Sequence, residues 1–295
     1  MTYPTAPGGL YLLALFFGLS VGSFLNVVIF RLPRENLSLT KPGRSFCPAC
    51  GAQISWFDNI PLLSWLWLRA RCRSCAKPIA ARYPLVELMT GLMSVYLFHV
   101  FGLSTAYLFY FYFFCCLLSI ALIDLELMII PMSLVYPTIA LGLVSAFVHP
   151  SVELAGFGLW TRLAPDCGPH VASLAGALGG LALGWGALAG VSLAYKLVRG
   201  HEGMGDGDPP LLGMIGVFLG WRSILMVILW STLIGILSAG LLIWFSKGRP
   251  PEEGWGRKAL PFGPFLVLGA LLYLFFGPEF LAWYWGLLGG QPTWM

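Results

Sequence analysis

The amino-acid sequence predicts an all-α, polytopic membrane protein with about eight transmembrane helices. Apolar residues make up 58% of the chain and charged residues only 10%, whereas roughly 25% of residues are charged in an average soluble domain. No charged residue precedes Arg31, but nine Lys or Arg residues lie from Arg31 to Arg82. So few ionic groups could not cover a water-soluble fold. The net charge of +4 therefore reflects loops beside a lipid bilayer and not a nucleic-acid partner.

Eight apolar stretches are candidate spans, because a transmembrane helix needs ~20 mostly apolar residues. The sixth is the shortest, and a tilted helix or one that continues from the Pro209-Pro210 turn would explain its length. The stretches are Leu10–Phe30, Leu85–Phe101, Tyr107–Leu122, Ile129–Val148, Val171–Leu197, Leu211–Gly220, Ile224–Phe245 and Leu260–Phe276. Residues 1–30 are thus expected to hold the first transmembrane helix, and residues 31–84 to form a loop.

Basic residues predict the orientation, because cytoplasmic loops carry an excess of Lys and Arg. With the N-terminus outside, fifteen of the seventeen basic residues fall in inner segments, and only Arg162 and Arg222 fall outside. The inner residues are Arg31, Arg34, Lys41, Arg44, Arg69, Arg71, Arg73, Lys77, Arg82, Lys196, Arg199, Lys247, Arg249, Arg257 and Lys258. We therefore expect a multi-pass protein with its N-terminus outside and the 31–84 loop in the cytoplasm.

The cytoplasmic loop carries two Cys-x-x-Cys pairs. Such pairs can close a tetrahedral zinc site with Zn–S bonds of ~2.3 Å, although the 21 residues between them slightly exceed the ~15–20 of the usual pattern. A redox-active or disulfide loop is the alternative, but disulfides do not persist in a reducing cytoplasm. A loop of ~50 residues also buries too little apolar surface to fold unaided. We therefore expect structural zinc at Cys47, Cys50, Cys72 and Cys75.

Acidic residues lie at the inner ends of two predicted spans, where a carboxylate beside hydrocarbon is costly and is usually functional or paired. Asp124 ends the third span, and Asp206 and Asp208 precede the sixth, interleaved with Gly205 and Gly207. The glycines allow close approach of backbone and substrate, and Asp208 could also cap the following helix. If Asp124 and Asp208 come close together, one keeps a proton and the other can activate water to attack a peptide carbonyl.

Other functions fit the same two aspartates. Two carboxylates at matched depth also suit a proton-coupled carrier, and each alone suits a helix cap or a polar helix end. No Ser/His/Asp set competes with them, because the four histidines are scattered along the chain. The residues alone therefore leave both a peptidase and a carrier open.

Five sequence blocks occur in the order found in one family of membrane proteins. Gly22–Pro33 is followed by the paired cysteines with Ile54–Pro61 between them, then by Arg82–Leu88, the Asp124 segment and a Gly-x-Gly-Asp motif. Through most of its length the chain resembles the type IV prepilin peptidases. These are bifunctional leader peptidase/N-methyltransferases and GxGD-type intramembrane aspartyl proteases.

The resemblance implies a transmembrane aspartyl peptidase domain over residues 85–295, with Asp124 and Asp208 as the catalytic pair. Asp206 also satisfies the motif, but Asp208 fits the family's spacing to the Leu-Leu and Gly-Trp pairs that follow. Asp206 is therefore the second choice for the catalytic residue, and it is expected to support the motif together with Gly205 and Gly207. The chain departs from the family's pattern at Met132, where aspartate is common, and at Pro210, where lysine is usual. These departures bear on substrate fit and loop geometry.

The resemblance also implies a substrate, a cofactor and a location. Members of the family cut a short basic leader from prepilins or pseudopilins at the cytoplasmic face of the bacterial inner membrane. They then often methylate the new N-terminal amine with S-adenosylmethionine. Glu87 is a candidate charge for binding that amine, or else a polar residue packed at the end of the second span. An inactive scaffold for type IV pilus or type II secretion assembly is a further alternative. The sequence fixes neither the pilin nor the oligomeric state.

Overall fold

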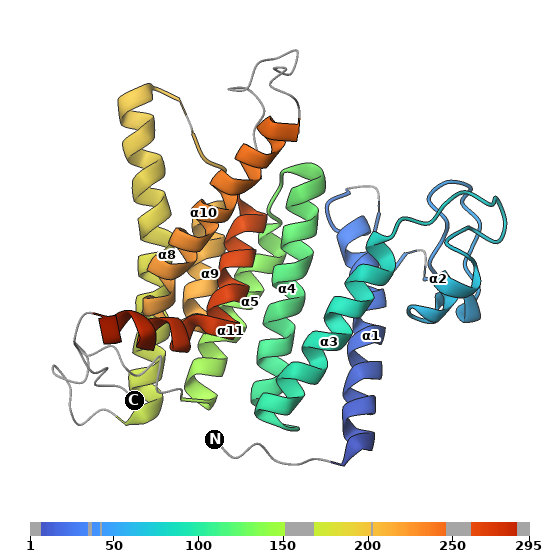
Figure 1. Cartoon of the computed structure of the whole chain (residues 1–295), viewed down its shortest axis with the longest axis horizontal. Coiled ribbons are helices and arrows are strands. Elements are labelled where there is room, and N and C mark those ends of the chain that lie inside the picture. Colours follow the sequence, from blue (N-terminus) through green and yellow to red (C-terminus); the bar gives the residue numbers. More distant parts are fainter. Residues whose placement is uncertain are drawn as a thin grey trace. The chain divides into compact units, whose positions relative to one another are not determined.

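The computed structural model describes residues 7–34, 37–41, 43–150, 168–201, 203–245 and 261–287 (Figure 1). Within these ranges the regular structure is helical, apart from two isolated β-bridges, Phe46 to Gln53 and Arg71 to Pro78. The chain divides into two compact units, Met1–Ile123 and Asp124–Met295. The predicted all-α class is confirmed.

Each unit holds several helices, and the long segment between α1 and α3 carries the cysteines. The first unit contains α1 (Gly8–Arg31), the one-turn 3-10 helix η1 (Trp56–Asn59), the short α2 (Leu63–Trp67), α3 (Arg82–Phe101) and most of α4 (Thr105–Leu127). The second contains the end of α4, α5 (Met132–Val148), α8 (Pro169–Arg199), α9 (Asp208–Leu219), α10 (Trp221–Phe245) and α11 (Gly263–Leu287).

In the first unit, α1 packs closely along α3 (Figure 1). Glycines on α1 permit the approach: a Cβ at Gly18 would lie 2.5 Å from the Cβ of Ser94, and a Cβ at Gly22 would lie 2.7 Å from the Cα of Glu87. Small residues are common at contacts between membrane helices, where close packing holds the helices together. This contact fixes the part of α3 that carries Glu87 against α1.

In the second unit, α9 is a short helix whose twelve residues are all buried. It contacts α5, α8, α10 and α11. Against α8 the two backbones meet directly, since a Cβ at Gly180 would lie 2.1 Å from the carbonyl oxygen of Gly216, and a Cβ at Gly216 would lie 2.2 Å from that of Gly180. Only glycine fits on either side, so this pair fixes α9 and with it Asp208, the first residue of the helix.

Five described helices are long and apolar enough to cross a membrane: Gly8–Arg31, Arg82–Phe101, Thr105–Leu127, Pro169–Arg199 and Trp221–Phe245. At the positions of the other predicted spans lie three shorter apolar helices, Met132–Val148, Asp208–Leu219 and Gly263–Gly277. At ~1.5 Å per residue, α9 rises only ~18 Å, against ~30 Å of hydrocarbon core. The protein is therefore a multi-pass membrane protein, and eight complete spans stay a prediction.

The basic residues behind the predicted orientation are only partly described. All nine from Arg31 to Arg82 lie in the described part of the chain, from the last residue of α1 to the first residue of α3. Five of the remaining basic residues lie outside the described part of the chain: Arg162, Lys247, Arg249, Arg257 and Lys258. The orientation stays a prediction that rests mainly on the basic residues of the loop between α1 and α3.

Candidate functional site

Asp124 lies in the last turn of α4 and is buried, with 4% of its surface exposed. Its Oδ2 accepts a hydrogen bond of 3.1 Å from the backbone N–H of Gly263, the first residue of α11. The first N–H groups of a helix have no partner within the helix, and the helix dipole is positive at this end. The contact requires glycine, because a Cβ at position 263 would lie 2.5 Å from the same oxygen.

Sequence reasoning missed Gly263. The residue stands in Pro261-Phe262-Gly263-Pro264, just before an apolar span. Proline and glycine together mark a turn, and proline is favoured in the first turn of a helix. This signal could have placed the start of α11, but not the carboxylate that faces it from 139 residues away.

Asp208 is also buried, with 4% of its surface exposed, at the first residue of α9. Its backbone N–H donates to the carbonyl of Gly205 at 3.2 Å, and the N-cap residue is Gly207. The prediction that Asp208 caps α9 is therefore wrong. The alternative in which the sixth helix continues from the Pro209-Pro210 turn is confirmed, since α9 includes both prolines. They fit in its first turn, whose N–H groups need no partner within the helix.

The structure brings Asp124 and Asp208 together. The two carboxylates lie within electrostatic range of each other, and the segment that joins α4 to α5 packs against both sites. In that segment Ile130 meets a glycine beside each aspartate: its Cδ1 would lie 3.4 Å from a Cβ at Gly263, and its Cβ 2.7 Å from one at Gly207. Two acidic residues far apart in the chain thus share one neighbourhood.

The remaining motif residues surround the turn before α9. Asp206 is exposed, in contrast to the buried Asp208. Met132, the first residue of α5, has its Cε 3.2 Å from where a Cβ at Gly207 would lie. Pro210 is buried within α9. The two departures from the family's pattern therefore lie at or beside the start of α9, and the carboxylates of Asp208 and Asp124 are still within electrostatic range of each other.

The four predicted metal ligands also come together, in the first unit. Their sulfur atoms all lie within 4.8 Å of one another. The Sγ atoms of Cys47 and Cys75 are 3.9 Å apart, far beyond the ~2.05 Å of a disulfide and close to the ~3.8 Å edge of a tetrahedron with Zn–S bonds of ~2.3 Å. All four cysteines are free of disulfides, so the cluster could hold a metal ion.

The two halves of the cysteine cluster share one backbone design. In each half, the N–H of the first cysteine, Cys47 or Cys72, donates to the carbonyl five residues later at 2.9 Å. The residue after the second cysteine turns the chain with a positive φ, 73° at Gly51 and 57° at Ala76. The repeated turn points both cysteines of each pair toward the same centre.

Cys72 is well suited to bind a metal. Backbone N–H groups of Cys75 and Ser74 lower the pKa of its thiol to about 7. The thiolate is the form that binds metals. A thiol with this pKa loses its proton readily when a metal binds near neutral pH. This supports a role for Cys72 as a metal ligand.

An ion pair connects the second half of the cluster to η1. The Nε and Nη2 atoms of Arg73 donate to the two carboxylate oxygens of Asp58 at 2.7 and 2.6 Å, a bidentate geometry that is stronger than a single contact. Hydrogen bonds from Arg73 lower the pKa of the Asp58 carboxyl. The segment that carries η1 is thereby held against the cysteine turn.

Glu87 has a structural contact that the sequence did not predict. It lies in α3 with 9% of its surface exposed, and its Oε2 accepts a hydrogen bond of 2.8 Å from the backbone N–H of Leu62. The Ser23 hydroxyl of α1 lies beside the same carboxylate. Glu87 therefore fastens the loop before α2 to α3, and its contact with a substrate amine stays a prediction.

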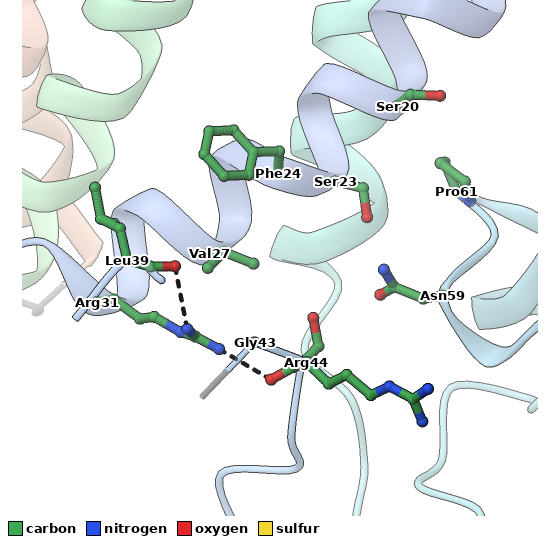
Figure 2. Close-up of a pocket in the computed structure, with 11 residues that line it drawn as sticks. Ser20, Ser23, Phe24, Val27, Arg31, Leu39, Gly43, Arg44, Asn59 and Pro61 are labelled. Carbon is green, nitrogen blue, oxygen red and sulfur yellow. Dashed lines mark hydrogen bonds between the residues drawn. The ribbon is translucent and has the colours of Figure 1, made fainter. Parts of the chain in front are cut away.

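A cavity of about 350 Å³ lies next to this contact, between one face of α1 and two loop segments (Figure 2). Ser20, Ser23 and Val27 line it from α1, Arg44 lines it from the loop after α1, and Asn59 lines it from the end of η1. Small-molecule sites have volumes of ~300–1,000 Å³ and combine apolar walls with a few polar groups. This cavity is at the lower end of that range.

Comparison with known proteins gives matches along most of the chain. A family model described as the bacterial peptidase A24 N-terminal domain matches residues 16–101, and one described as the type IV leader peptidase family matches residues 111–240. A protein of Stutzerimonas stutzeri is 38% identical, over 94% of each chain. Proteins of Aeromonas hydrophila and Pseudomonas aeruginosa are each 35% identical, over 92% of each chain. All three are named prepilin leader peptidase/N-methyltransferase. No solved structure matches the chain significantly.

Proposed function

The chain belongs to the type IV leader peptidase family, and we propose that it cleaves the leader peptide of type IV prepilins or pseudopilins and then methylates the new N-terminal amine. One observation carries the peptidase half: the buried carboxylates of Asp124 and Asp208 lie within electrostatic range of each other. The name of the relatives supplies the methyltransferase half.

In the proposed mechanism the two aspartates act together on water and on the scissile peptide bond. Two neighbouring carboxyl groups share one proton, because charging both is unfavourable. The ionised group takes a proton from water as the water oxygen attacks the carbonyl carbon, while the protonated group donates a hydrogen bond to the carbonyl oxygen. When the carbon–nitrogen bond breaks, a proton passes to the leaving amine.

The turn before α9 gives the substrate a way in. A Cβ at Gly205 would lie 3.4 Å from Oδ2 of Asp208, so the absence of side chains there leaves room beside the carboxylate. Gly205 and Asp206 are exposed, whereas α9 is buried along its whole length. An extended peptide therefore reaches Asp208 over Gly205, and Asp206 supports the turn without touching the reacting atoms.

Methyl transfer needs a methyl donor, and the implied one is S-adenosylmethionine. When bound, it would supply an electrophilic methyl group to the neutral amine nitrogen and would leave as S-adenosylhomocysteine, with one proton lost from the nitrogen. Glu87 is the candidate carboxylate for holding the substrate amine, in addition to its hydrogen bond with the N–H of Leu62.

The proposed location is the bacterial inner membrane, with the N-terminus outside. The basic loop between α1 and α3 then faces the cytoplasm, and so do the inner ends of α4 and α9 with their aspartates. Prepilin leaders are expected on this side of the membrane. A reducing cytoplasm also keeps the four free cysteines available for zinc.

Zinc is the proposed ion of the cysteine cluster, and Cys72→Ser is expected to remove it. A serine hydroxyl is a poor replacement for a thiolate in a tetrahedral zinc site, and loss of a structural metal destabilises the loop that it closes. Elemental analysis of the purified chain should show zinc in the parent and little or none in Cys72→Ser. Ser74→Ala, which changes an exposed neighbour, should keep the metal. Full zinc content in Cys72→Ser would contradict the site.

A cleavage assay tests the proposed function as a whole. The purified full-length chain in detergent is incubated with a precursor that carries a short basic leader, with and without S-adenosylmethionine. We expect a shortened product in both samples and a methylated N-terminus only when the donor is present, both read by mass spectrometry. Cleavage without methylation would remove the second half of the proposal, and no cleavage would remove the first.

A further inference from the structure

Buried charged residues hold both loop walls of the cavity beside α1. On one side Arg31, with 4% of its surface exposed, donates to the carbonyl oxygens of Ser38, Leu39 and Arg44 at 3.2, 3.3 and 3.1 Å. Figure 2 shows the bonds to Leu39 and Arg44 at the edge of the cavity. Burying a charge is costly unless hydrogen bonds compensate it, so this arginine serves to fix the loop wall in place.

The opposite wall is fixed by a buried carboxylate. Glu87 accepts the N–H of Leu62, the residue after Pro61, which lines the cavity. Asn59, on the same wall, follows Asp58 and therefore sits next to the ion pair with Arg73. The cavity thus has preformed walls on both sides, as expected for a small-molecule site.

The lining offers the groups that an adenosyl amino acid needs. Phe24 and Val27 on α1 provide apolar surface for a flat base, and the amide of Asn59 can both donate and accept hydrogen bonds at the edge of that base. The guanidinium of Arg44 lies at the exposed rim (Figure 2). Guanidinium groups bind carboxylates in a bidentate manner, so Arg44 suits the carboxylate of an amino acid.

One end of the cavity also has an unsatisfied acceptor nearby. The amide nitrogen of Asn26 donates to the carbonyls of Gly22 and Tyr83 at 3.3 and 3.1 Å, which fixes the orientation of the amide. Its buried Oδ1 has no hydrogen-bond partner in the described part of the chain. Asn26 lies one helical turn from Ser23, and Ser23 lies beside Glu87. Ser23, which lines the cavity, therefore lies between the cavity and the buried carboxylate of Glu87.

We infer that this cavity binds the methyl donor, S-adenosylmethionine, with Arg44 available for its carboxylate and with Ser23 and Glu87 at the end where the substrate amine arrives. The inference rests on the proposed function, since only methyl transfer requires this ligand. The cavity lies wholly in the first unit, whereas Asp124 and Asp208 lie in the second. Cleavage and methylation therefore depend on different residues and can be lost separately.

The test is binding of S-adenosylhomocysteine, the unreactive product, to the full-length chain in detergent by isothermal titration calorimetry. Val27→Trp places an indole in the cavity and is expected to raise Kd about tenfold or more, a free-energy change of ~1.4 kcal/mol or more. Val21→Trp is the matched control, because Val21 is a half-buried valine of the same helix that does not line the cavity. Its Kd should stay near the parent value, and leader cleavage should persist in both variants.

Three further substitutions guard against a folding defect and separate the roles of Glu87. Asn59→Ala, at the exposed last residue of η1, should weaken binding about fivefold through one lost hydrogen bond and keep the zinc of the chain. Glu87 acts as a positioning residue: Glu87→Gln can still accept the N–H of Leu62 and should bind S-adenosylhomocysteine nearly as well as the parent. Glu87→Ala should bind it more weakly, because the wall is released.

The outcomes are distinct. A higher Kd in Val27→Trp and Asn59→Ala, with zinc content and cleavage retained, supports the site. Parent-like affinity in both variants would overturn it and leave the proposed function standing. If the parent chain methylates its product and Val27→Trp binds S-adenosylhomocysteine as tightly as the parent, the methyl donor binds elsewhere. A chain that cleaves but neither binds nor methylates would overturn the inference together with the methyltransferase half.

Discussion

Asp124→Asn and Asp208→Asn should each lower leader cleavage at least ~10³-fold, because a positioned acid or base contributes ~10²–10⁴-fold and the two groups act as one unit. Asparagine keeps the size of aspartate but can neither take a proton from water nor give one to the leaving amine. Cleavage rates on a basic-leader precursor, measured at equal amounts of purified protein, check this. Membrane abundance should match that of the parent.

Asp206→Asn is the matched control for this pair. It makes the same chemical change two residues from Asp208, in the same turn, on a side chain that is exposed. Its cleavage rate should stay within a few fold of the parent rate. If Asp206→Asn abolishes cleavage while Asp208→Asn does not, the catalytic residue is Asp206 and the assignment made here is wrong.

Gly263→Ala should reduce cleavage ~10²-fold, the usual cost of moving a reacting group by ~1 Å. The added Cβ would lie 2.5 Å from Oδ2 and 3.2 Å from Cγ of Asp124, so the carboxylate or the start of α11 must shift. The hydrogen bond between the Gly263 N–H and Asp124 would be strained or lost. Steady-state cleavage kinetics should show the loss mainly in kcat, because the leader-binding residues are unchanged.

Gly286→Ala is the control for that substitution. It makes the same change near the other end of α11, where an added Cβ would meet nothing within 4 Å. It should leave the rate unchanged and raise helix stability slightly, since alanine is a better helix former than glycine. Equal rates for Gly263→Ala and the parent would show that the contact with Asp124 is dispensable.

The cysteine cluster could be predicted from sequence because its signal is local. The two Cys-x-x-Cys pairs lie on one loop that is too polar to enter the bilayer. Pairs with this spacing commonly bind one metal ion together. The all-helical class followed in the same way from apolar stretches of spanning length. The meeting of Asp124 and Asp208 was only a hypothesis at that stage, because it depends on how α9 packs among its neighbours.

Other parts of the site could not be predicted because they depend on tertiary contacts. α9 is apolar like a membrane span, yet it is short and buried on all sides, and hydropathy does not distinguish these cases. Glu87 has the same sequence signature whether it binds an amine or holds a backbone N–H. Gly263 has no side chain, so no pattern of chemical groups could indicate that its N–H faces Asp124.

The hydrogen bond from Gly263 has a consequence for recognising inactive members of such a family. The helix that donates it begins at residue 263, beyond the segment 111–240 that matches the leader peptidase family. A gene product that stopped after Phe245 would keep both aspartates, both glycines of the motif and that whole segment. It would nevertheless lack the N–H of Gly263, which orients the carboxylate of Asp124. A search for the sequence motifs alone would therefore classify such an impaired enzyme as active.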